Sequence, residues 1–339
     1  MTLPSQPGIP DHPVPERLLA QLFRAAVDAV EPKAALTRAF AKEPPLPAKR
    51  VWIIASGKAS AAMAQAAEEM LAAQSRTLAG GVIVGLERAG RSHPSIRTCV
   101  AEHPLPGPGS LAAALALEDL IAHVRPDDEA WVLLSGGSTS LLAAPVEGSG
   151  IAQEDLGALF AYLLESGLEI GIMNAIRKRV TRWGAGRLAT ALGRAGANTR
   201  CYVVSDVIND ELRAIGSGPC VADATTADDV QTLLTQAGWE KTPDSIRRYL
   251  NAVTEGTAPE TPKGTNAVFG RVTSRIIATN ADATHAAAAR ARELGLRVAR
   301  IREPLQGEAA LAGARFVDGL DPAIPQDEPS GTPHCVVQG

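Results

Sequence analysis

Aromatic residues are scarce in this chain, and no stretch of it stays apolar for long. Phe, Trp and Tyr make up 4% of the residues, and 33 basic against 37 acidic side chains give a formal net charge of −4. A surface that binds nucleic acid usually needs a basic excess and aromatic rings for stacking, so we expect no nucleic-acid partner. The apolar runs are too short to span a bilayer, so we expect no membrane partner either.

Cysteines are also few, and they are scattered. Cys99, Cys201, Cys220 and Cys335 form no CxxC pair. This spacing indicates neither a zinc site nor a disulfide framework, and it is typical of reduced thiols. The N-terminal residues are polar and rich in proline, unlike a secretory signal peptide. These features together predict a cytoplasmic protein.

The strongest structural signal is an alternation of short apolar runs with helical patterns. Continuous apolar runs occur at 51–55, 82–84, 130–134 and 201–204, and amphipathic or Ala-rich segments separate them. Such strands are typical of a parallel sheet that helices cover on both faces. We therefore predict an α/β protein with a large, Rossmann-like parallel-sheet domain and a smaller, incomplete C-terminal α/β domain.

The 339 residues suit two domains of ordinary size. We predict a Pro-rich arm over 1–15, the large domain over 16–236, a connector over 237–266 and a partial C-terminal domain over 267–339. Within the last region we expect a helix over 282–294. Strands at 275–279, 297–301 and 335–338 are expected to form one partial sheet.

Small and charged residues follow three of the predicted strands, where ligands bind in open α/β sheets. Gly136, Gly137 and Ser138 follow the strand 130–134, and backbone N–H groups in such a turn can hold an anion. The alternative is a tight turn without a ligand. Lys58 follows the strand 51–55, where it is either a phosphate contact or an exposed surface lysine.

Two carboxylates follow the strand 201–204. Asp206 and Asp210 can hold Mg²⁺ or accept a hydroxyl proton, or they can serve as a helix cap and a turn. His103 lies in a Pro-rich loop and is either catalytic or a structural loop histidine. We favour the structural interpretation, which is the more frequent one for a single loop histidine.

Residues 174–187 are the densest basic cluster of the chain. On a helix, Asn174, Arg177 and Lys178 share a face, whereas Arg179 points elsewhere. Arginine forks match carboxylate and phosphate oxygens, so the cluster can clamp an anion. The alternative is a solvated charged face.

The order of these motifs resembles that of the glycerate 2-kinase family, whose members are often also labelled hydroxypyruvate reductase. The resemblance covers about residues 16–339. It rests on seven motifs in order: Gly57-Lys58-Ala59, His103-Pro104-Leu105-Pro106, Ser135-Gly136-Gly137-Ser138-Thr139-Ser140-Leu141-Leu142, Asn174-Ala175-Ile176-Arg177-Lys178, Gly186-Arg187-Leu188-Ala189, Ser205-Asp206-Val207 and Ser217-Gly218-Pro219.

The resemblance implies a kinase that phosphorylates D-glycerate at its 2-hydroxyl with ATP and Mg²⁺, giving 2-phosphoglycerate. A homodimer of this chain is a further possibility. The implied catalytic residues are Lys58 and Asp206. The implied nucleotide contacts are Lys58, Gly136, Gly137 and Ser138, the implied substrate contacts are Asn174, Arg177 and Arg187, and the implied metal ligands are Asp206 and Asp210.

The chain departs from the family pattern in two respects. Gly184 stands where the family has a lysine, which leaves either one ligand cation fewer or Arg182 in its place. Family members also continue beyond the position of Gly339, so we expect an incomplete smaller domain. Two alternatives therefore stay open, a weakly active or inactive binding remnant and a hydroxypyruvate reductase. The reductase is disfavoured because no GxGxxG opens a helix.

Overall fold

The computed structural model describes residues 15–42, 50–90, 93–301, 303–319 and 334–339. The contacts divide the chain into two compact units. The larger unit is Pro32–Ile277, and the smaller unit combines Met1–Glu31 with Ala278–Gly339. This division differs from the predicted boundaries, because the first helix groups with the C-terminal segment and not with the large domain. None of the described helices is long and apolar enough to cross a membrane.

The larger unit is built on a six-stranded sheet with the order β3-β2-β1-β4-β5-β6. The strands are β1 (Arg50–Ser56), β2 (Thr77–Gly85), β3 (Ile96–Val100), β4 (Glu129–Leu134), β5 (Asn198–Val204) and β6 (Val272–Ala278). Strands β1 to β5 pair in parallel, so that Ile54 stands between Val82 and Val132. The predicted α/β class and the parallel sheet are therefore confirmed.

Both faces of the sheet are buried, which explains why its strands are continuously apolar. Trp52 and Ile54 point to one face, where α4 (Pro108–Ala122) and α8 (Arg187–Arg194) pack. Ile53 points to the other face, where α2 (Pro32–Lys42) and α3 (Ser60–Ala73) pack and where Phe40 lies against Trp131.

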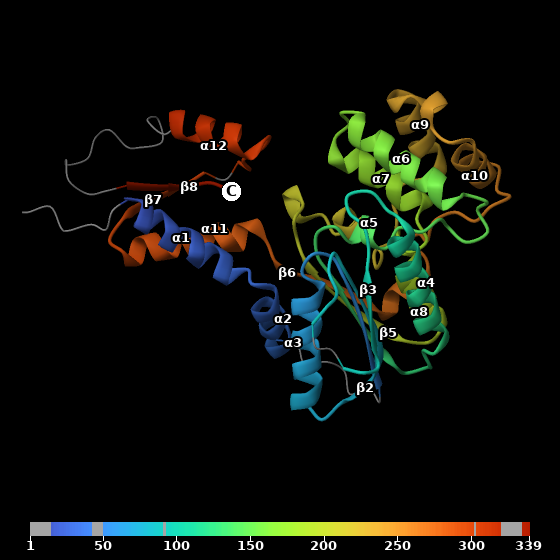
Figure 1. Cartoon of the computed structure of the whole chain (residues 1–339), viewed down its shortest axis with the longest axis horizontal. Coiled ribbons are helices and arrows are strands. Elements are labelled where there is room, and N and C mark those ends of the chain that lie inside the picture. The colour runs from blue at the N-terminus through green and yellow to red at the C-terminus, as the bar shows by residue number, and fades with distance from the viewer. Residues whose placement is uncertain (1–14, 43–49, 91–92, 302, 320–333) are drawn as a thin grey trace, which may run out of the picture. The chain divides into compact units, whose positions relative to one another are not determined.

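A group of helices with its own apolar core extends from the sheet-bearing part of the larger unit. It comprises α6 (Gln153–Glu165), α7 (Ile170–Val180), α9 (Ala227–Ala237) and α10 (Asp244–Thr254), which lie together in Figure 1. Its core contains Leu159, Phe160, Ile176, Val230 and Leu250. The short helix α5 (Ser138–Leu141) follows β4 directly.

The smaller unit contains α1 (Pro15–Ala29), α11 (Asn280–Glu293), β7 (Arg297–Arg300), α12 (Ala309–Asp318) and β8 (His334–Val337). Helix α1 packs along α11 (Figure 1), with Leu22 against Ala291 and Leu296. Strands β7 and β8 form a parallel pair.

The prediction of one C-terminal sheet from strands 275–279, 297–301 and 335–338 is wrong. The first of these strands is β6, which lies beside β5 at the edge of the large sheet. Only the other two pair with each other. Hydrophobic pattern alone locates a strand but does not say which neighbour it pairs with, since pairing is a long-range property.

The strand order places a topological switch point between β1 and β4. From β1 the chain proceeds outward through β2 and β3, then crosses to the other side of β1 and continues through β4, β5 and β6. Loops at the carboxyl ends of the two central strands therefore diverge, and a crevice for ligands forms there in folds of this order. These loops carry Lys58 and Gly136.

The separate pairing of β6 and β7 can be tested by hydrogen exchange. We expect amides of β6 to exchange at least about tenfold more slowly than those of β7, because β6 opens with the large sheet and β7 belongs to a two-stranded pair. The measurement is native-state exchange read by mass spectrometry of overlapping peptides. Equal protection in β6 and β7 would contradict the division of the two strands between separate sheets.

Candidate active site

The loops that follow β1 and β4 are joined by a close network of hydrogen bonds. The backbone N–H of Ser135 donates to the Ser56 carbonyl at 3.1 Å, and that of Lys58 donates to the Gly136 carbonyl at 2.9 Å. The Ser135 hydroxyl accepts from the Ala59 N–H at 2.9 Å, and the Ser138 hydroxyl donates to the Ser56 carbonyl at 2.7 Å. The backbone of Lys58 is therefore fixed, although its side chain is exposed.

Gly57 is the residue that permits this approach. Its φ is +119°, and a Cβ at this position would overlap the hydroxyl and carbonyl oxygens of Ser135. Both the backbone conformation and the close contact exclude a side chain. Position 57 thus requires glycine for the two loops to meet.

Side chains from three strand ends converge on Gly136 and Gly137. A Cβ on Gly136 would overlap the carboxylate of Asp206, which follows β5. A Cβ on Gly137 would stand 3.2 Å from Cδ2 of His103, which follows β3, and 3.8 Å from Cγ of Lys58, which follows β1. The structure therefore brings Lys58, His103 and Asp206 together around the two glycines.

The two glycines offer unused donors at this point. Among the described residues, the backbone N–H groups of Gly136 and Gly137 find no acceptor. Such N–H groups, together with the Lys58 ammonium, make an environment that favours an anion. The backbone N–H of Ser138, in contrast, already donates to the Ser135 carbonyl at 3.4 Å. Its hydroxyl lies 2.7 Å from both the Ser56 and the Ser135 carbonyl oxygens, which share its one proton.

Burial and the charges around His103 shift the pKa of its imidazole. Partial burial lowers the pKa of its imidazole, as do the positive charges of Lys58 and Arg177, while the Asp206 carboxylate opposes them. These three side chains come from the ends of β1 and β5 and from α7. The electrostatic coupling therefore extends the group of converging residues to Arg177.

Arg177 is a buried cation whose guanidinium lacks an anionic partner within the described part of the chain. Its residue is 6% exposed, and the guanidinium lies over the Phe160 ring at 4.7 Å from the ring centroid. Its Nε and one Nη are buried without a hydrogen-bond partner, and burial lowers its pKa. An uncompensated buried charge is costly, so this geometry favours an anionic ligand.

The neighbouring cations of the basic cluster are all engaged within the protein. Lys178 pairs with the buried Asp223 at 2.8 Å. Arg179 contacts Glu260 and Asp223 and donates to the Thr225 carbonyl. Lys178 and Arg179 thus form a structural charge network, and neither is a solvated surface charge.

Arg187 and Arg182 have structural partners as well. Arg187 donates to the carbonyls of Lys178, Arg179 and Thr181, so it satisfies the last turn of α7. Arg182 pairs with Glu118, and its Nε donates to the Pro145 carbonyl. The geometry therefore points away from Arg187 as a substrate contact and from Arg182 as a substitute for the absent lysine.

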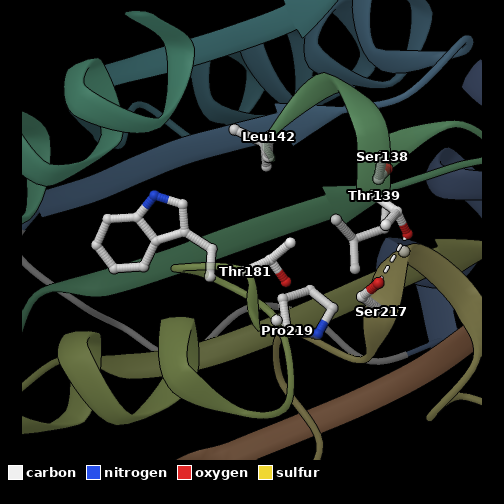
Figure 2. Close-up of a pocket in the computed structure, with 10 residues that line it drawn as sticks. Ser138, Thr139, Leu142, Thr181, Ser217 and Pro219 are labelled. Atoms are coloured by element: carbon white, nitrogen blue, oxygen red, sulfur yellow. Dashed lines mark hydrogen bonds between the residues drawn. The ribbon is translucent and has the colours of Figure 1, made fainter. Parts of the chain in front are cut away.

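A small cavity lies behind the β4 loop (Figure 2). Its volume is about 10 Å³, enough for one water molecule. Thr139 and Ser217 are hydrogen-bonded beside it at 2.9 Å, which ties α5 to the loop 216–219. Gly184 lines it too, and a Cβ there would stand 2.6 Å from Thr181 Oγ1. The hydrogen bond beside the cavity holds the helix that follows the glycine loop in place. Position 184 has no room for a side chain without a shift of Thr181.

The remaining predicted residues are less defined. Asn174 lies on α7, one turn before Arg177, and is half-buried. Asp210 ends a short 3₁₀ turn with its φ at +53°. No three His, Cys, Asp or Glu side chains gather as a metal site within the described residues. The carboxylate of Asp206 borders Gly136. Mg²⁺ beside a nucleotide needs only one or two carboxylates, because phosphate oxygens and water supply its other ligands.

His103 lies beside the glycine loop, although the sequence favoured a structural part for it. A single loop histidine is usually structural, but the order of the strands brings the end of β3 close to the loops after β1 and β4. The sequence signal that could have identified it is position, because His103 follows a strand as Lys58 and Asp206 do. That strand, β3, has the sequence Ile96-Arg97-Thr98-Cys99-Val100, which lacks a continuous apolar run.

The Gly57 constraint yields a prediction about stability. Gly57→Ala should lower the free energy of unfolding by about 2–4 kcal/mol, because the new Cβ adds backbone strain and a clash with Ser135. Urea unfolding of both proteins measures the difference. Gly90→Ala is the matched control, since nothing lies within 4 Å of a Cβ there. Similar stability of the two variants would contradict the packing of these loops.

The buried pair of Lys178 and Asp223 yields a second prediction. Burial alone would raise the pKa of the Asp223 carboxyl, but the Lys178 ion pair and the Thr225 hydrogen bonds lower it overall. Asp223→Asn should cost about 3–5 kcal/mol near neutral pH, because it leaves buried cations without their carboxylate.

The pH dependence of that cost follows from the sign of the shift. A lowered carboxyl pKa contributes stability above the unfolded-state pKa, and this contribution is lost as the pH falls through the folded-state pKa. The difference in the free energy of unfolding between wild type and Asp223→Asn, measured in urea, should therefore narrow as the pH falls below about 4, the ordinary pKa of an aspartate carboxyl. Asp119→Asn, at an exposed site on α4, is the control. If the difference in the free energy of unfolding stays constant with pH, Asp223 does not carry the stabilising negative charge.

Comparisons with known proteins identify the family of this chain. A family model described as "Domain of unknown function (DUF4147)" matches residues 18–251. The glycerate 2-kinase of Pyrococcus horikoshii is 34% identical over 78% of this chain and 57% of its own length. A putative hydroxypyruvate reductase of Agrobacterium vitis is 35% identical over 90% of this chain and 65% of its own length. The chain thus spans less than two thirds of these two curated relatives.

Solved structures agree on the fold. The crystal structure of a glycerate kinase from Thermotoga maritima superposes with a TM-score of 0.79 at 28% identity, covering 96% of this chain and 73% of that protein. The match includes both compact units described above, since it extends over nearly the whole chain. The chain therefore belongs to the glycerate kinase family.

Proposed function

We propose that this protein phosphorylates D-glycerate at its 2-hydroxyl with ATP, giving 2-phosphoglycerate. The observation that carries the proposal is Arg177, a buried guanidinium with two nitrogens that lack a hydrogen-bond partner. Its positive charge lowers the pKa of His103, which lies beside the glycine loop. A small hydroxy acid brings the carboxylate that Arg177 lacks. A nucleotide brings the phosphates that suit Lys58 and the free N–H groups. The names of the relatives support the same substrate class.

In this proposal, separate residues bind the two substrates. Arg177 holds the glycerate carboxylate, and Asn174 on the same helix face contacts a substrate hydroxyl. Lys58 and the N–H groups of Gly136 and Gly137 hold the transferring phosphate. Phosphoryl transfer relies on such positioning and charge stabilisation more than on covalent chemistry by the protein.

Asp206 is the proposed Mg²⁺ ligand, with Asp210 as a second carboxylate a short distance along the chain. Bound Mg²⁺ neutralises phosphate charge during transfer. Asp206 fits this part because its carboxylate borders Gly136, where the phosphates are proposed to lie. Arg187 has no part in the proposal, since carbonyl groups of the protein already occupy its donors.

The activity is tested by adding D-glycerate and Mg-ATP to this 339-residue chain. Enolase as the coupling enzyme detects 2-phosphoglycerate and not its 3-phospho isomer, so the assay reports the position of transfer. An ADP-release assay run in parallel detects transfer to any hydroxyl. ADP release without an enolase signal would contradict the 2-position, and no ADP release would contradict the kinase. Saturable NADH binding would favour the reductase that the Agrobacterium relative's name suggests.

Lys58→Ala should lower kcat by about 10²-fold or more, because the transferring phosphate loses a preorganised cation. Lys42→Ala, at an exposed position at the end of α2, is the matched control and should keep the wild-type kcat. Steady-state kinetics with both substrates measure the effect. A kcat for Lys58→Ala equal to that of the control would exclude Lys58 from the site.

Arg177→Met separates ligand binding from stability. Removing a buried charge that lacks a partner should keep or raise the Tm of the ligand-free protein. The same change should raise the Kd for D-glycerate by about 10-fold to 100-fold, the cost of one charged hydrogen-bond pair. Thermal unfolding and calorimetry measure the two quantities. A destabilised variant with unchanged glycerate affinity would assign Arg177 a structural part instead.

A further inference from the structure

The backbone on both sides of His103 is anchored. The carboxylate of Glu102 accepts from the backbone N–H groups of Gly109 and Ser110 at 3.0 Å each, at the start of α4. The carbonyl of Pro104 accepts from the Ser140 hydroxyl at 2.7 Å, within α5. Two separate helices therefore hold the residues before and after His103, which fixes the position of its Cα.

The His103 ring, in contrast, is uncommitted. Neither of its nitrogens has a hydrogen-bond partner among the described residues, and the ring is only partly buried, so much of it is open to solvent. His93, His123 and His285 each use Nδ1 in a hydrogen bond to the protein. A fixed backbone with a free ring is what a group needs when it must meet a ligand in a set geometry.

The ring faces the place where the reacting groups are proposed to lie. His103 Nε2 stands 3.4 Å from the point that a Cβ of Gly137 would occupy, and Lys58 Cγ stands 3.8 Å from the same point. The Gly137 N–H is a proposed phosphate contact, and Arg177 is the proposed carboxylate contact. The charge of Arg177 acts on the His103 imidazole. A ligand held by both Gly137 and Arg177 would therefore have its 2-hydroxyl, beside its carboxylate, near the imidazole.

We propose that His103 is the catalytic base that takes the proton from the 2-hydroxyl of glycerate. This inference rests on the proposed kinase activity. Asp206 then serves the phosphate and its metal, and it makes no hydrogen bond to His103 within the described residues.

The step balances in atoms and charge. The hydroxyl proton moves to Nε2 as the hydroxyl oxygen forms its bond to the γ-phosphorus of ATP. The bond between that phosphorus and the β,γ-bridging oxygen breaks, and ADP leaves with the electron pair. The imidazolium then returns its proton to solvent.

The local charges support an imidazole that is neutral near neutral pH. Partial burial, Lys58 and Arg177 lower the His103 pKa, while Asp206 opposes them. A neutral imidazole with its acceptor nitrogen free can take a proton, whereas an imidazolium cannot. Activity that depends on this base should fall as the pH drops through the lowered pKa, below about 6.5.

The test is His103→Gln in the full 339-residue chain, assayed with D-glycerate and Mg-ATP. We expect kcat to fall by about 10²-fold or more, with each KM within about threefold of the wild-type value. The acid limb of the wild-type kcat–pH profile should disappear in the variant. Added imidazole should restore part of the activity of His103→Ala. His123→Gln, at an exposed histidine at the end of α4, is the control and should behave as wild type.

The outcomes separate the two proposals. Absence of wild-type turnover would overturn the kinase, and the base with it. Wild-type turnover that His103→Gln retains would overturn His103 alone. A rise in KM at constant kcat, without imidazole rescue, would also overturn the base, since it would assign His103 to binding.

Discussion

The close contact between the ends of β1 and β4 is the constraint on which the site depends. Two parallel strands with apolar faces pack only when helices cover both sides, and their exit loops must then diverge at the switch point. Here the loops diverge from a shared network centred on Ser135, and that network requires glycine at position 57. Lys58 and Gly136 are therefore positioned by the sheet itself and not by flexible loop segments.

A second constraint is the neutralisation of buried charge. Lys178 and Arg179 lie beside Arg177 on one helix turn, and the protein supplies Asp223 and Glu260 for them. Arg187 satisfies the carbonyls where α7 ends. Arg177 receives an aromatic ring but no carboxylate among the described residues. A helix that compensates most of its cations and leaves one is better explained by a ligand than by a general deficit of acidic residues.

Much of the larger unit could be predicted from the sequence. The runs at β1, β4 and β5 are apolar because both faces of the sheet are covered, and the polar residues after them mark the ligand edge. The partner of β6 could not be predicted, since its pattern suits either sheet and only long-range packing decides. The relation of Arg177 to His103 could not be predicted either, because it depends on how segments far apart in the sequence pack. The ion pair of the neighbouring Arg179 with Glu260, 81 residues away, shows the same long-range dependence.

His103 shows why position at a strand end is more informative than residue type. As an isolated loop histidine it has many explanations, and most of them are structural. In the fold, β3 and β5 stand on opposite sides of the two central strands, so residues that follow them approach the glycine loop from two directions. Lys58 follows the central strand β1 at the same edge of the sheet. A lysine, an imidazole and a carboxylate thus border the same pair of glycines, which the strand order makes possible. The proposed phosphoryl transfer depends on this kind of positioning and charge stabilisation.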